Sequence, residues 1–319
     1  MKNKICFFGL LHIKNYENRA LNFNSANENE KVLVYLKKAI LLDRQLQYYG
    51  HRLILITNKK NYLKKILKNL KYDLNLRSIK FKTFVPKNTH FYSCHFRVDV
   101  FKYLSSLKKV YSILLDLDTL ILKNPEKFSL MQKKNIALVN DISQNVIPAY
   151  GRNQILKRLK ILNPKINKVF WFGGDFFAGN YIFFKSLYLE SNFFQKKFVQ
   201  NKKYLYNQTD ELFITASLYN LKNKKNLKIK YAKELNIFTR YWNTNVLHDQ
   251  KKIIYYKKFI FLHTPADKIF LSNCYEKIKN QKNFQLDYFN YVLSIKNSIK
   301  IKLSKILPKI LKDKIKNFI

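Results

Sequence analysis

Two aspartates, one residue apart, lie between two apolar runs, and this stretch constrains the fold more than any other. The run Ile113–Leu115 precedes Asp116, and the run Leu120–Leu122 follows Asp118 closely. An apolar run that contains no polar residue is typical of a strand that is buried on both faces in a parallel sheet. Because side chains alternate along a strand, the two carboxylates would point to the same side if the strand continued through both.

Two neighbouring carboxylates repel each other unless a positive charge lies between them. Hard oxygen ligands suit Mg²⁺ or Mn²⁺, and an ion that also carries substrate phosphates needs only one or two protein carboxylates. In open α/β sheets, ligands bind at the carboxyl ends of the strands. A pair of this kind also arises by chance in loops, but the apolar flanks of Asp116 and Asp118 favour a metal and phosphate site.

The chain before this stretch alternates between strand and helix patterns. Ile5–Leu11 predicts a buried first strand, 31–49 a helix and His51–Thr57 a second strand. This order is typical of a parallel sheet, so we predict an α/β fold with a mostly parallel, Rossmann-like central sheet flanked by helices. Further along we expect a helix over 62–70, a third strand near 79–85, and a flexible or lid region over 141–169.

The composition fits a folded protein with an affinity for anionic surfaces. Hydrophobic residues make up 47% of the 319 residues, which excludes a disordered chain. The formal net charge is +41, but only eight of the 61 basic residues are Arg, the residue that nucleic-acid recognition favours. We therefore expect no nucleic-acid partner and retain attraction to anionic membranes.

The cysteines and the C-terminus indicate where the protein acts. Cys6, Cys94 and Cys274 are odd in number and far apart, and no segment has about 18 uninterrupted apolar residues, so we expect a cytoplasmic protein. From about Ser298, apolar residues at helical spacing alternate with lysines, which predicts a basic amphipathic membrane anchor. The alternative is a helix that packs on the domain. We place a helical tail at 276–319.

Several residues outside the aspartate pair are candidate ligands. Phe7 and Gly9 belong to the first strand, where a glycine lets a ligand approach the backbone. Arg97 lies in the helix that leads into the Asp116 strand, and His263 ends a late apolar strand with Lys268 five residues on. The alternative for Arg97 is a surface ion pair, and a lone His is more often structural.

Two acidic groups complete the candidates. Three of the six glycines fall within 173–179, around Asp175, which indicates tight backbone geometry or close contact with a ligand. Asp210 and Glu211 begin a predicted helix, where acids also stabilise the helix dipole without any catalytic role.

With these residues placed, the chain resembles the GT-A glycosyltransferases, in particular the retaining families 8 and 6. In family 8 an Arg-bearing helix precedes a strand that ends Leu-Asp-x-Asp, here Arg97 and then Leu115–Asp118. Phe176–Gly179 is similar to that family's Phe-Asn-Ala-Gly, with Phe177 in place of the Asn. His263 is similar to its third metal ligand. The resemblance covers roughly residues 1 to 270.

Family 6 offers a second alignment for the middle of the chain. Its Tyr-x-Gly-Gly-x-Phe-Phe-Gly-Gly run is similar to 171–179, and its His-Asp-Glu segment is similar to 207–214. On that alignment Glu211 takes the place of the candidate nucleophile, so the resemblance implies Glu211 as the first choice of catalytic carboxylate, with Asp210 and Asp175 behind it.

The resemblance implies a metal-dependent hexosyltransferase. Asp116, Asp118 and His263 would hold Mn²⁺ or Mg²⁺, and Arg97 and Lys268 would add positive charge near the diphosphate of a UDP-sugar. Phe7, Gly9 and Asp116 would also contact this donor. The acceptor would be a cell-surface glycan or glycolipid, reached from the inner face of the membrane, and the reaction would retain the anomeric configuration. The nucleotide-sugar half would span about 1–125 and the acceptor half about 126–275.

Two other functions stay open from the sequence. Asp116 to Leu120 is close to the Asp-x-Asp-x-Thr signature of haloacid dehalogenase-type phosphatases, although Leu120 stands where the Thr belongs and the motif lies far from the first strand. A basic nucleic-acid or membrane-surface binding protein would make no use of the two aspartates.

Overall fold

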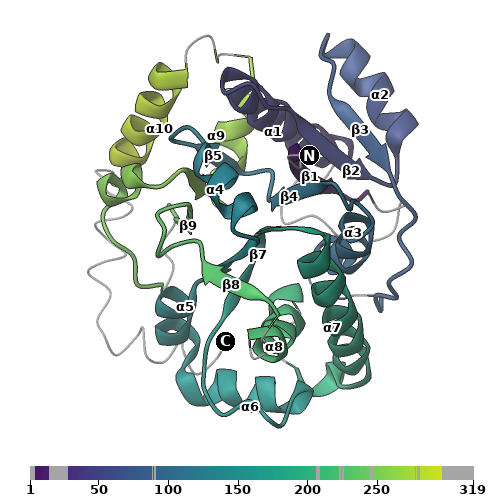
Figure 1. Ribbon diagram of the computed structural model, residues 1–319. Helices are drawn as coiled ribbons and strands as arrows, with labels where there is room; N and C mark the ends of the chain where they lie inside the picture. The colour runs from purple at the N-terminus through teal and green to yellow at the C-terminus, as the bar shows by residue number, and fades with distance from the viewer. Residues whose placement is uncertain are drawn as a thin grey trace.

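The computed structural model describes residues 4–13, 28–87, 89, 91–205, 209–222, 224, 226–243, 248–276, 278 and 281–296. Within this part, two sheets and a set of helices form an α/β fold (Figure 1). The predicted tail from Ser298 and the family 6 match at Asn207 lie outside the described residues.

The larger sheet has seven strands in the order β3-β2-β1-β4-β7-β6-β8. Its strands are β1 (Lys4–Leu11), β2 (Leu53–Thr57), β3 (Asn75–Ser78), β4 (Val110–Leu115), β6 (Ile136–Asp141), β7 (Phe172–Gly179) and β8 (Lys228–Tyr231). Four of its pairings are parallel, and only those of β7 with β4 and β6 are antiparallel. The predicted α/β class with a mostly parallel central sheet is confirmed.

Helices cover both faces of this sheet. They are α1 (Glu28–Tyr48), α2 (Lys60–Asn69), α3 (Arg97–Leu104), α4 (Lys127–Lys133), α5 (Ser143–Tyr150), α6 (Arg152–Leu162), α7 (Tyr181–Gln200), α8 (Asp210–Lys222), α9 (Lys268–Asn273) and α10 (Gln281–Lys296). The segment from α5 to α8 lies in the lower part of Figure 1, and the first two strands lie at its top.

Alternation along the strands divides the core into two layers. Phe7, Ile113 and Leu115 pack with α1, α2, α4, α9 and α10 on one face. Phe8 and Leu114 point the other way and pack with α3, α6, α7 and α8. Because both faces are buried, β4 has no solvent-exposed side, as its apolar run Ile113–Leu115 predicts.

Two local expectations were wrong. The third strand runs over Asn75–Ser78, while 79–85 has no regular structure. The region 141–169, expected to be flexible or a lid, contains α5 and α6, and the α6 residues Ile155, Leu159 and Leu162 are fully buried in the second core layer. Helix packing there comes from tertiary contacts that weak periodicity does not reveal.

A smaller sheet of three strands lies beyond the end of β4. Its order is β5-β10-β9, with β5 at Thr119–Ile121, β10 at Phe261–His263 and β9 at Phe238–Arg240. The chain passes from β4 in the large sheet to β5 in the small one through the turn that holds the two aspartates. This crossing brings distant parts of the sequence to the carboxyl end of β4.

A candidate metal site and its acid pair

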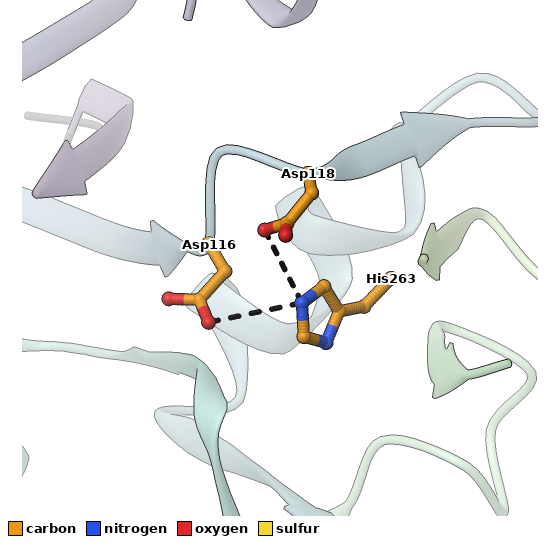
Figure 2. A group of neighbouring side chains, drawn as sticks. All are labelled: Asp116, Asp118 and His263. Carbon is orange, nitrogen blue, oxygen red and sulfur yellow. Dashed lines mark ion pairs between the residues drawn. The ribbon is translucent and has the colours of Figure 1, made fainter. Parts of the chain in front are cut away.

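The two aspartates lie in the turn between β4 and β5, so the strand does not continue through both. The alternation of side chains along one strand therefore does not apply to this pair. Their carboxylates nevertheless converge on one point. Figure 2 shows Asp116 at the end of its strand, Asp118 across the turn, and the ring of His263 facing both. A turn brings the two oxygens to one imidazole where strand alternation would have set them side by side.

Strand registers explain why these residues meet. In the large sheet Leu115 pairs with Phe176, so the next backbone contact joins Asp116 N to the carbonyl oxygen of Asp175 at 3.0 Å. In the small sheet His263 pairs with Thr119 on one side and with Arg240 on the other. The two sheets therefore place residues from four segments around one point.

Three side-chain atoms face one another at this point. His263 Nε2 lies 3.8 Å from Asp116 Oδ2 and 3.3 Å from Asp118 Oδ1. Among the described residues, these three side chains form a group whose ligand atoms all lie within 4.8 Å of one another. The predicted metal-ligating residues are thus brought together, with two carboxylate oxygens and an imidazole nitrogen, a donor set that can hold a divalent cation.

The second atom of each prospective ligand is held by another side chain. His263 Nδ1 lies 2.7 Å from Asp175 Oδ2, and Asp116 Oδ1 accepts a hydrogen bond from Arg97. A carboxylate behind a metal-ligating histidine fixes both its tautomer and its ring orientation. In this arrangement Nδ1 carries a proton, and Nε2 faces the carboxylates of Asp116 and Asp118.

Two lysines hold the second oxygen of Asp118. Lys38 Nζ lies 3.4 Å and Lys268 Nζ lies 3.2 Å from Asp118 Oδ2. Although burial raises the pKa of the Asp118 carboxyl, these two ammonium groups bring it well below its usual range. Asp118 is therefore ionised, with one oxygen engaged and the other turned toward His263.

The imidazole replaces a cation when no metal is bound. Burial alone would lower the pKa of His263, but the carboxylates of Asp118 and Asp175 raise it to about 9. A charged imidazole thus neutralises the group at neutral pH, and a divalent cation that binds here displaces its proton. The residues present fit a divalent metal.

The acid pair begins α8 and joins the same network through Arg97. This buried guanidinium contacts both Asp116 and Asp210. Burial raises the pKa of Asp210 to about 6, against the opposing charge of Arg97. Arg97 was expected near the site, and the structure gives it the role of a bridge between the aspartate pair and the acid pair.

Glu211 is the more exposed of these two acids. Its Oε2 accepts a hydrogen bond from Trp171 Nε1 at 2.7 Å, and its Oε1 accepts from Arg240 Nη2 at 2.6 Å and from Gly174 N at 3.4 Å. About 17% of its side chain is exposed, compared with 3% for Asp210. Both carboxylate oxygens are fixed in position, one by Trp171 just before β7 and the other by donors from β7 and β9.

Asp175 lies deeper than either acid. Its Oδ1 accepts from Asn140 at 3.0 Å, and its Oδ2 accepts from Arg240 at 2.7 Å in addition to the contact with His263. The side chain is fully buried, and the cations of Arg240 and His263 hold its pKa far below the usual range against the effect of burial. These contacts favour a positioning role for Asp175.

The glycine pair of β7 makes room for these charges. A Cβ on Gly173 would lie 2.4 Å from Asp175 Oδ1, and a Cβ on Gly174 would lie 2.7 Å from Asp210 Oδ2 and 2.9 Å from Arg97 Nη1. Both glycines lie inside a strand. Their clustering therefore reflects close packing of buried ion pairs on the two faces of β7.

The first-strand candidates are packed into the core. Phe7 is fully buried against Phe128 and Phe261, and a Cβ on Gly9 would lie 2.5 Å from Leu117 Cδ2. Gly9 thus leaves space for the residue between the two aspartates. The expectation that Phe7 and Gly9 contact a nucleotide stays a prediction.

Sequence reasoning missed two cations of the site, Lys38 and Arg240. Lys38 is a fully buried lysine of α1, and Arg240 ends β9 and joins Asp175 to Glu211. Arg240 is one of only eight arginines, the same signal that identified Arg97. Lys38 lies within the apolar run around Leu36 and Ala39, but its neighbour is also a lysine. The sequence pattern therefore did not indicate which of the two lysines is buried.

Comparisons with known proteins give matches among solved structures. No protein-family model matches the chain, and no curated protein matches it. Among solved structures, the chain is similar to the apo form of mouse xyloside xylosyltransferase 1, with a TM-score of 0.48 and 9% sequence identity over 83% of this chain and 99% of that one. A likeness this distant gives no argument about activity, so we base the functional proposal on the geometry of the site.

We predict that Asp175→Asn weakens Mn²⁺ binding by about 10- to 100-fold, the usual effect of removing the carboxylate behind a ligating histidine. Isothermal titration with Mn²⁺ measures the change. Asp287→Asn, an exposed acid on α10, serves as the control of equal charge change. Unchanged Mn²⁺ affinity in a folded Asp175→Asn protein would contradict the role assigned to this carboxylate.

Proposed function

We propose that the protein is a metal-dependent glycosyltransferase of the GT-A type that takes its sugar from a UDP-sugar. The observation that carries this proposal is the convergence of one ligand atom each from Asp116, Asp118 and His263 at the carboxyl end of β4. A cation held by only three protein atoms keeps coordination positions for the oxygens of a diphosphate.

A divalent cation at this site would stabilise the negative charge that develops on the departing diphosphate. Asp116, Asp118 and His263 would hold it, and Arg97, Asp175 and the lysines fix the ligands in place. Lys268 is partly exposed and adds a cation at the same edge. Fixed charges that are already in position require no rearrangement during the reaction.

On the sugar side, Glu211 is the carboxylate we place nearest the anomeric carbon. Transfer with an oxocarbenium-like transition state needs a negative charge there. Glu211 is the most exposed of the three candidate acids and is held rigidly by Trp171 and Arg240. Asp210 lies behind it, paired with Arg97, and supports the orientation of α8 at the site.

The finer assignments follow from the resemblance. We propose a hexose donor, transfer with retention, and a lipooligosaccharide, lipopolysaccharide or capsule glycan as acceptor. Residues 1–125 would bind the nucleotide sugar and 126–275 the acceptor. Relatedness to families 8 or 6 belongs to the same proposal.

We predict that Asp118→Asn lowers Mn²⁺-dependent turnover of UDP-glucose or UDP-galactose by about 100-fold or more, the size of effect that loss of one charge-stabilising group produces. The assay measures released UDP. Asp287→Asn is the control. Full activity in Asp118→Asn would refute the site, and release of inorganic phosphate from phosphate esters in place of UDP would favour the phosphatase alternative.

The membrane assignment rests on the tail alone. No helix in the part of the chain that the structure describes has the length and apolar character needed to span a bilayer. We propose that 298–319 anchors the protein at the inner face of the cell membrane. Removal of this segment should abolish sedimentation with anionic vesicles while donor hydrolysis persists, and unchanged sedimentation would contradict the assignment.

A further inference from the structure

Lys38 is an unusual residue in the core-facing side of α1. Its side chain is fully buried, and its Nζ donates no hydrogen bond to any described residue. Its charge contacts Asp118 Oδ2 at 3.4 Å and lies over the ring of Tyr35, 4.0 Å from the ring centre. The ammonium therefore points at a prospective metal ligand and has little else to compensate its burial.

A buried ammonium of this kind is costly, and a neutral apolar side chain of similar length would normally suit the position better. Lys38 lies on the buried side of α1, where Leu42, one turn further along the helix, is also fully buried. Its ammonium compensates the buried carboxylate of Asp118, so any cation that Asp118 binds also meets this charge.

The two oxygens of Asp118 have different partners, and Lys38 is one reason for this. Lys38 and Lys268 occupy Oδ2, while Oδ1 faces His263 Nε2. An approaching cation meets Asp118 Oδ1 in place of the imidazole proton and is repelled by an ammonium on the far side of the same carboxylate. Lys268 is partly exposed, whereas Lys38 is fully buried.

We propose that Lys38 is a positioning residue of the metal site, a fixed counter-charge that limits Asp118 to one ligating oxygen and keeps the affinity for a free divalent cation low. This inference rests on the proposed metal site. An anionic donor supplies the negative charge that offsets Lys38, so the cation binds best together with its diphosphate.

The test is a Mn²⁺ titration of the full chain without nucleotide, with free Mn²⁺ measured by electron paramagnetic resonance. We expect Lys38→Met to bind Mn²⁺ at least about tenfold more tightly than the wild type, because one repelling unit charge near the ion is gone. Lys37→Met, which removes the neighbouring, partly exposed lysine, should leave the affinity unchanged.

A gain of affinity separates this role from a structural one, since damage to the position of Asp118 would weaken Mn²⁺ binding. If Lys38→Met does not fold, Lys38→Gln removes the same charge with a polar side chain and carries the same expectation. Wild-type affinity or weaker binding in a folded neutral variant overturns the inference.

The same titration separates this inference from the proposed function. The Mn²⁺ affinity of Asp118→Asn gives the background binding that does not involve the proposed site. If neither the wild type nor the Lys38 variants bind Mn²⁺ better than Asp118→Asn, the metal site fails and both proposals fall. If the wild type binds and the neutral Lys38 variants bind equally, the metal site stands and only the role of Lys38 is refuted.

Discussion

The packing of the structure depends on the basic side chains that compensate two carboxylates at the buried end of β4. Carboxylates in such a place need partners, because desolvated charge is costly. Asp116 is paired with Arg97 from α3, and Asp118 with Lys38 from α1 and Lys268 from α9. Helices on both faces of the sheet therefore contribute charged side chains to one turn. The same ion pairs hold the helices against the sheet and position the site.

A single rule describes the site: each prospective ligand has one atom held by a side chain outside the group and one atom that faces the other two ligands. Asp116 and Asp118 each give one oxygen to a basic side chain, and His263 gives Nδ1 to Asp175. The remaining atoms face one another, with His263 Nε2 3.3 Å from Asp118 Oδ1. Arg240 extends the network from Asp175 to Glu211, so that the metal ligands and the acid pair are held by one connected set of charges.

Local sequence patterns predicted the parts of this architecture that depend on periodicity and on strong residue types. The apolar run of β4 and the βαβ start predicted the fold class. Asp116 and Asp118 were recognised from their apolar flanks, and His263 from its place at the end of an apolar strand and from the family resemblance. Lys38 and Arg240 escaped, because their importance arises from tertiary placement. The glycines at 173 and 174 were noticed for the right reason, tight geometry, but the atoms they accommodate belong to residues far away in the sequence.

The most direct test is a crystal structure of the protein with Mn²⁺ and UDP, with anomalous scattering used to locate the metal. The account predicts one strong peak bound by Asp116 Oδ2, Asp118 Oδ1 and His263 Nε2, with both lysines still at Asp118 Oδ2 and oxygens of the diphosphate on the open side. A peak away from these three atoms, or UDP bound with no metal among them, would contradict it.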